Sequence, residues 1–154
     1  MAEAIWSLLY LGYLPRLPGT AGSLGGLLIY LGLMRLPLSG MTVPAAAAVL
    51  LAGAVWGGFR AQRHYDQIDP LPCVIDEGCG ILVALIGIAT FPLWHGAVLG
   101  FALFRLFDVT KPFPIRRVEK LTGGWGIALD DVLAGIYANI SCRVLLAVIS
   151  AALH

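Results

Sequence analysis

This chain has little charge. Of its 154 residues only 12% are charged and 59% are hydrophobic, above the ~45–50% apolar content of ordinary soluble domains. The mean hydropathy is +0.87. A net charge of +1 excludes a strongly basic nucleic-acid-binding protein, so we expect no nucleic-acid partner. The composition predicts an integral membrane protein that forms a single domain over residues 1–154.

Cysteine and histidine are also scarce. The three cysteines are odd in number and lack C-x-x-C spacing, which argues against a disulfide framework or a zinc site. We expect them to be small buried side chains. His64 and His95 have no partner at metal-binding spacing, and interfacial positions are expected for both. Neither residue type therefore predicts a metal site.

The apolar residues fall in runs that Gly, Pro and polar residues interrupt, without an internal repeat. This pattern predicts an all-α membrane bundle of about four to five membrane-embedded helices plus a short N-terminal helix. Two of the runs, residues 24–36 and 97–107, are shorter than the ~20 residues that span a bilayer. The expected helices cover residues 5–14, 24–36, 45–59, 78–90, 97–107, 115–121 and 127–153, with a loop at 15–23 and a flexible joint at 123–126.

The path between residues 78 and 107 has two interpretations. A single span would put the acids of residues 76–77 and Asp108 on opposite sides of the membrane. Pro92 and the pair Trp94–His95 favour a hairpin instead, with its turn at residues 91–96. The hairpin brings every polar stretch to one end of the bundle, together with eight of the ten basic residues. The positive-inside rule then predicts that this end is cytoplasmic.

Seven of the nine carboxylates lie in three short polar stretches, residues 65–78, 104–114 and 126–135. Carboxylates near lipid are costly and usually functional. Helix capping explains one acid at a helix start, but adjacent acids exceed what capping needs. We expect Asp66 and Asp69 to be solvated loop residues. The predicted metal ligands and catalytic acids are Asp76, Glu77, Asp108, Asp130 and Asp131.

Two cations accompany these acids. Arg105 and Asp108 are three residues apart, so they share a helix face and form an ion pair, bind phosphate, or do both. Lys111 is a candidate for both catalysis and substrate binding. In the loop PGTAGS, glycine-rich backbone and hydroxyl groups precede a helix, which favours contact with an anion. Its predicted substrate-binding residues are Thr20, Gly22 and Ser23.

These motifs, in this order, resemble the phosphatidylglycerophosphatase A family of lipid phosphatases. The most specific segments are FRLFDVTKPFPIRRVE and GGWGIALDDVLAGIYAN. The resemblance implies an all-helical bundle in the bacterial inner membrane and Mg²⁺-dependent removal of phosphate from phosphatidylglycerophosphate. The acid pairs match the acidic motifs of that family.

The residues support the same chemistry. Mg²⁺ prefers carboxylates, water and phosphate oxygens, and it can polarise a phosphoryl group and activate water. Lys111 and Arg105 would neutralise phosphate charge. One alternative is a phosphatase for another lipid phosphate. The other is a small carboxylate-lined transporter, and two features disfavour the transporter: the acids cluster at one end, and the sequence shows no inverted repeat. The nucleophile, the number of metals and the oligomeric state stay open.

Overall fold

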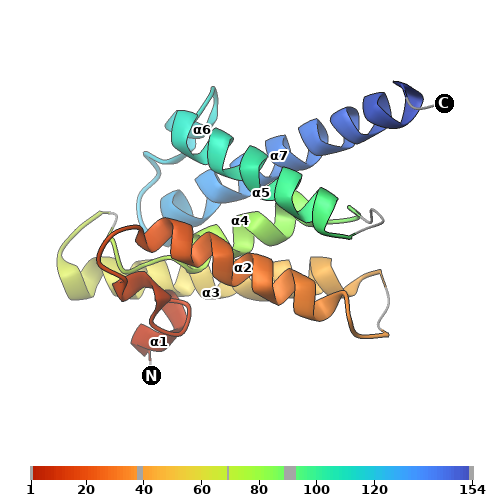
Figure 1. Ribbon diagram of the computed structural model, residues 1–154. Helices are drawn as coiled ribbons and strands as arrows, with labels where there is room; N and C mark the ends of the chain where they lie inside the picture. Colours follow the sequence, from red (N-terminus) through yellow and green to blue (C-terminus); the bar gives the residue numbers. More distant parts are fainter. Residues whose placement is uncertain (1, 38–39, 69, 89–92, 153–154) are drawn as a thin grey trace.

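The computed structural model describes residues 2–37, 40–68, 70–88 and 93–152, and these parts contain helices and no strand (Figure 1). The all-α prediction is therefore confirmed. Asp69 and residues 91–92 of the predicted turn at residues 91–96 lie outside the described residues, whereas residues 93–96 are helical, so the turn prediction was wrong there. The elements are α1 (Ala2–Trp6), the 3-10 helix η1 (Leu11–Tyr13), α2 (Pro18–Leu33), α3 (Thr42–Tyr65), α4 (Ile75–Leu85), α5 (Leu93–Thr110), α6 (Ile115–Val118) and α7 (Gly124–Ala152).

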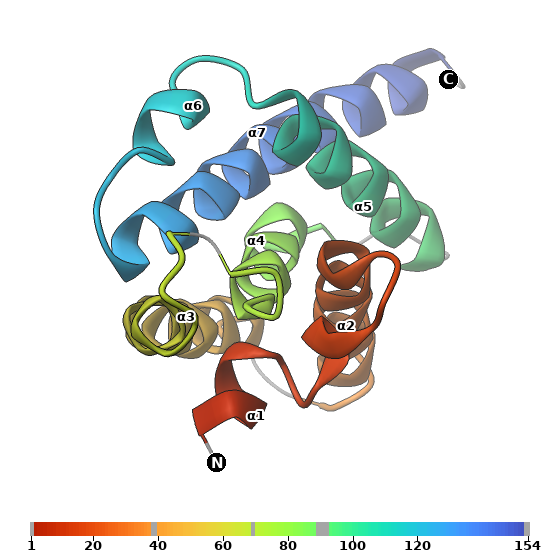
Figure 2. The same ribbon diagram turned by 90° about the vertical axis from the view of Figure 1, so that its left-hand side faces the viewer.

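Helix α4 lies at the centre of the bundle. Viewed from one end, α2, α3, α5 and α7 surround it, and it contacts all four (Figure 2). Its residues Ile81, Leu82, Ala84 and Leu85 are fully buried. A helix that is apolar on every side is stable only where neighbours cover every side, and this explains the central position of α4.

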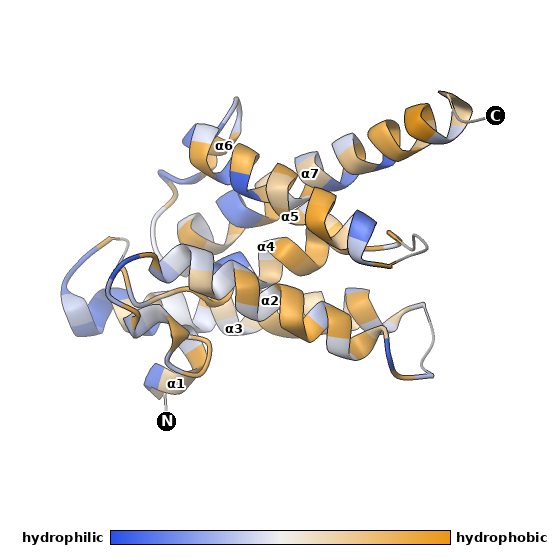
Figure 3. Cartoon of the chain, in the orientation of Figure 1, coloured by the Kyte–Doolittle hydropathy of each residue, from blue (hydrophilic) through white to orange (hydrophobic). Residues whose placement is uncertain are grey.

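The polar segments gather at one end of the bundle, as the hairpin interpretation requires. α2, α4 and α7 begin at this end, whereas α3 and α5 finish there (Figure 1). α4 runs away from this end and α5 returns to it, packed against α4 and α7. The single span across residues 78–107 is therefore wrong. Figure 3 shows hydrophilic residues concentrated at the same end.

Three of the described helices are long and apolar enough to cross a membrane: α3, α5 and α7. This is fewer than the four to five membrane-embedded helices expected, because α2 has 16 residues and α4 only 11. A helix as short as α4 ends inside the bundle, where its last carbonyls need partners. The Asn139 side-chain amide donates to the carbonyls of Ala84 and Ile86 at 2.9 Å, and Arg143 donates to Ile86 at 2.7 Å.

Three further local predictions were wrong. Residues 5–14 do not form one helix, because Leu8, Leu9 and Tyr10 have positive φ angles between α1 and η1. The expected loop at residues 15–23 ends at Leu17, since Pro18 opens α2 at a position where its missing N–H is harmless. The expected joint at residues 123–126 contains the start of α7, where Gly124 lets this helix pack tightly against the backbone of Val55 in α3.

Candidate active site

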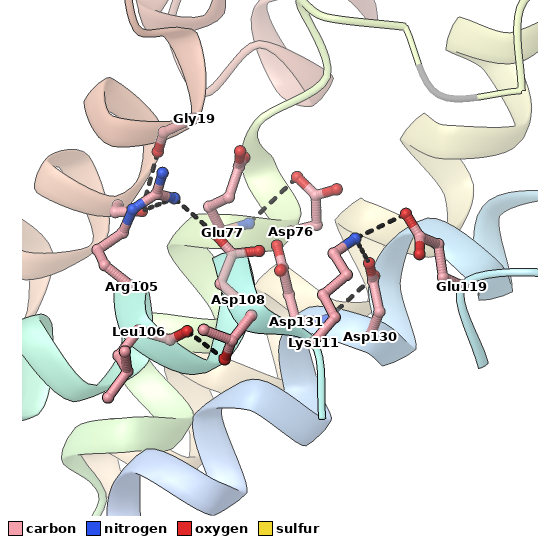
Figure 4. Close-up of polar contacts among 12 residues, drawn as sticks. Gly19, Asp76, Glu77, Arg105, Leu106, Asp108, Lys111, Glu119, Asp130 and Asp131 are labelled. Atoms are coloured by element: carbon pink, nitrogen blue, oxygen red, sulfur yellow. Dashed lines mark hydrogen bonds and ion pairs between the residues drawn. The ribbon is translucent and has the colours of Figure 1, made fainter. Parts of the chain in front are cut away.

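The five predicted acids converge on one cavity at the polar end of the bundle. Asp76 and Glu77 come from the first turn of α4, Asp108 from the last turn of α5, and the remaining two from α7 (Figure 4). The cavity has a volume of about 150 Å³. All five carboxylates and Lys111 line it, which confirms the predicted convergence from three segments: Asp76, Glu77, Asp108, Lys111, Asp130 and Asp131.

Three of these acids form a tight cluster, which we call the carboxylate triad: Asp76, Glu77 and Asp131. One carboxylate oxygen from each lies within 4.8 Å of the others. Asp76 and Asp131 are buried, and Oε2 of Glu77 is buried without a hydrogen-bond partner among the described residues. Burial raises the pKa of Glu77 well above its ordinary value, and the charge of Asp131 adds to this effect. Glu77 therefore lies where a bound proton or a bound cation is favoured.

Capping explains these acids only in part. The N-cap of α4 is Val74, whose side chain makes no capping hydrogen bond. Asp76 accepts a hydrogen bond from the backbone N–H of Glu77 at 3.1 Å, which is local support within the first turn. Asp130 and Asp131 lie in the second turn of α7, because this helix begins at Gly124 rather than beside them. Their N–H groups already have helical partners, so capping is excluded as their role.

The other two acids are held by cations. Arg105 Nη1 donates to Asp108 Oδ2 at 2.7 Å, the ion pair expected from their spacing. Lys111 Nζ lies 2.8 Å from Asp130 Oδ2 and 2.8 Å from Glu119 Oε1 (Figure 4). Burial opposes the charge of Lys111, but the hydrogen bonds to Asp130 and Glu119 outweigh burial and raise its pKa above the ordinary value. Lys111 is therefore a permanent cation at neutral pH.

Sequence reasoning missed Glu119. It lies just after α6, outside the three acid-rich stretches, yet it lines the cavity and shares Lys111 with Asp130. The available signal was its position eight residues after Lys111, across the Pro112–Pro114 turn. Residues on either side of such a turn can meet, but this spacing alone does not identify the pair.

Glycines let the helices that carry the acids approach closely. A Cβ atom on Gly80 of α4 would lie 2.8 Å from the backbone oxygen of Asp131, and one on Gly135 of α7 would lie 2.5 Å from the backbone oxygen of Gly80. This contact brings the first turn of α4 beside the second turn of α7. The small residues Gly80 and Gly135 thus help to position the triad.

The predicted anion-binding loop PGTAGS is instead the first part of α2. Ser23 is fully buried, donates to the carbonyl of Gly19 at 2.8 Å and receives a 3.4 Å hydrogen bond from Arg105. A Cβ on Gly19 would lie 2.4 Å from Glu77 Oε1, and one on Gly22 would lie 2.6 Å from the carbonyl of Val74. This segment therefore orients Arg105 and makes room for Glu77. None of Thr20, Gly22 and Ser23 lines the cavity.

Fold and site together define a helical membrane protein with a carboxylate-rich cavity flanked by two cations. A family model for phosphatidylglycerophosphatase A matches residues 4–146, and the chain belongs to this family. It is therefore an enzyme rather than a transporter.

Relatives cover most of the chain. The phosphatidylglycerophosphatase A of Haemophilus influenzae is 39% identical over 84% of this chain and 78% of its own length. That of Escherichia coli is 30% identical over 85% and 77%. A Bacteroides thetaiotaomicron protein named "Putative phosphatidylinositol-3-phosphatase" is 36% identical over 86% of each chain. No solved structure matches.

Proposed function

We propose that this protein hydrolyses phosphatidylglycerophosphate to phosphatidylglycerol and phosphate. The observation that carries the proposal is the single cavity in which five carboxylates meet Lys111, in a chain of the phosphatidylglycerophosphatase A family. A phosphomonoester dianion needs positioning and charge neutralisation more than covalent chemistry from the protein. Cations supply neutralisation here, and acidic side chains supply sites for a metal ion and for a proton.

The carboxylate triad fits Mg²⁺. All its donor atoms are carboxylate oxygens, which this hard cation prefers, and one oxygen from each acid lies within 4.8 Å of the others. The unpartnered Oε2 of Glu77 is an atom that a ligand would satisfy. Asp76, Glu77 and Asp131 would hold the ion, and Asp108 and Asp130 remain candidates for ligation through water. When bound, Mg²⁺ would neutralise phosphate charge and acidify a water molecule.

The protein groups around the triad divide the remaining tasks. Lys111 stays charged at neutral pH, so it donates hydrogen bonds to phosphate oxygens and cannot act as a base. Asp130 and Glu119 hold its Nζ at the cavity wall. Arg105 does not itself line the cavity, but Asp108, which does, and Ser23 orient it, and it would be the second phosphate donor. A carboxylate is left as the acceptor for the proton of the attacking water.

We also propose that the cavity faces the cytoplasm from the bacterial inner membrane. The apolar faces of α3, α5 and α7 would contact lipid, and the hydrophilic end would lie at the surface (Figure 3). Eight of the ten basic residues lie at this end, as positive-inside topology requires: Arg16, Arg60, Arg63, Arg105, Lys111, Arg116, Arg117 and Lys120.

One relative's name supports a second candidate, the 3-phosphate of phosphatidylinositol. Purified protein in detergent should be assayed for phosphate release from phosphatidylglycerophosphate, phosphatidic acid and phosphatidylinositol 3-phosphate, with Mg²⁺ and with EDTA. The Asp131→Asn variant controls for contaminating phosphatases. We expect the highest kcat/KM on phosphatidylglycerophosphate, with Mg²⁺ required. A higher kcat/KM on phosphatidylinositol 3-phosphate would replace the proposal with the second candidate.

A further inference from the structure

A second cavity adjoins the cavity of the five carboxylates. Its volume is about 480 Å³, and it shares four lining residues with the first: Gln62, Ile68, Glu119 and Leu121. Common walls mean that the two cavities lie side by side, between the end of α3 and the segment that joins α6 to α7. A ligand too large for the carboxylate cavity can therefore extend into this second cavity.

The second cavity has one cation that is not neutralised. Glu119 is the acid in its wall, and Lys111 compensates its charge at 2.8 Å. Lys120 also lines the cavity, is exposed, and forms no salt bridge within the described part of the chain. The apolar side chains of Ile68 and Leu121, 79% and 47% exposed, stand beside it. An unpaired cation next to exposed apolar groups suits an anionic group of a lipid.

We propose that the second cavity binds the phosphodiester of the lipid substrate, with Lys120 as its ligand. This inference rests on the proposed function. In phosphatidylglycerophosphate, a glycerol joins the terminal phosphomonoester to a phosphodiester. The carboxylate cavity, at about 150 Å³, is smaller than the ~300–1,000 Å³ of pockets that hold whole small ligands, so it suits one phosphate. The phosphodiester then lies in the adjoining cavity.

Lys120 would thereby select lipids that carry a second phosphate over those with a phosphomonoester alone. The two lysines act on different groups, since Lys111 faces the phosphate that is cleaved and Lys120 the one that remains. Loss of Lys120 should weaken binding of the lipid and leave binding of free phosphate intact.

The test uses Lys120→Ala, Lys120→Arg and Arg117→Ala in the full chain, assayed with phosphatidylglycerophosphate and with inorganic phosphate as competitive inhibitor. Arg117 is the matched control, because it is a nearby exposed cation that stacks on Phe113 and lies outside both cavities. Lys120→Ala should raise KM about tenfold, as for loss of one charge-assisted hydrogen bond, with a smaller effect on kcat. Lys120→Arg should retain most of the affinity.

Inorganic phosphate distinguishes the roles of the two cavities, because it would bind only in the carboxylate cavity. Its inhibition constant should be the same in wild type and Lys120→Ala. An unchanged KM in Lys120→Ala would overturn the inference, as would an equal rise in Arg117→Ala or a parallel rise in the phosphate inhibition constant. Wild-type protein that fails to hydrolyse phosphatidylglycerophosphate would instead reject the proposed function, and this inference with it.

Discussion

The site contains acids of two kinds. Asp108 and Asp130 each form a 2.7–2.8 Å salt bridge with a cation on the same or a neighbouring segment. In the carboxylate triad, no salt bridge to Glu77 or Asp131 occurs among the described residues, and Oε2 of Glu77 has no hydrogen-bond partner. Buried charges are normally paired or bound to metal. Salt bridges thus compensate one group within the protein, whereas the other group is where we propose that an ion binds.

The largest expected effect comes from neutralising the triad. Glu77→Gln and Asp131→Asn keep side-chain volume and remove charge, so the fold should survive while kcat/KM for lipid phosphate falls by more than about 100-fold. Even groups that only support a metal ligand cost ~10–100-fold when mutated. Phosphate-release assays on purified variants measure this loss.

Asp66→Asn is the matched control for these variants. Asp66 is exposed, lies outside the cavity and adopts a left-handed backbone conformation that asparagine also accepts. It should behave like wild type. Triad variants that keep wild-type activity and metal dependence would erase the distinction between the two kinds of acid.

Replacing the cations that pair with Asp108 and Asp130 should give the next largest effect. Lys111→Ala and Arg105→Ala should each lower kcat/KM by roughly 10–150-fold, the value of one charge-assisted contact with phosphate. Enough Mg²⁺ should still bind, because the triad is unchanged. If Arg105 serves only as the partner of Asp108, Arg105→Ala will lower thermal stability in detergent while the folded enzyme turns over normally.

A smaller effect should follow from crowding the triad without changing its charge. In Gly19→Ala the new Cβ would lie 2.4 Å from Glu77 Oε1, so this carboxylate must move, and we expect kcat/KM to fall by roughly tenfold. Gly32→Ala on the same helix is the control, since nothing lies within 4 Å of its Cβ position. The Gly32→Ala substitution should raise the free energy of unfolding by about 0.5–1 kcal/mol. Equal activity in both variants would show that Glu77 tolerates displacement.

Much of the fold follows from residue patterns. Apolar runs and breaking prolines predicted the helices and the hairpin, and the hairpin predicted that Asp76, Asp108 and Asp131 would meet. Local pairs such as Arg105–Asp108 also follow from helical spacing. The helices, the hairpin and the local pair depend on residues close in the chain, so the sequence displays them directly, and the meeting of the acids follows from the hairpin.

The remaining features depend on contacts between distant segments. Glycines in residues 18–23 and 123–126 indicated flexible chain, but tight packing of α2 on α4 and of α7 on α3 makes them helical. α4 can end short of a membrane span because Asn139 and Arg143 donate hydrogen bonds to the carbonyls at its end. The division of the five acids into a triad and two salt-bridged residues likewise depends on side-chain distances that no spacing rule supplies.

The melting temperature of purified protein in detergent, measured with EDTA and with increasing Mg²⁺, tests directly whether the triad binds a metal ion. An ion that binds only the folded state, present at a concentration 100 times its dissociation constant, stabilises the folded state by ~2.7 kcal/mol. We predict a clear Mg²⁺-dependent rise for wild type and Asp66→Asn, and its loss in Glu77→Gln and Asp131→Asn. The same rise in all four proteins, or no rise in wild type, would contradict a metal site at the triad.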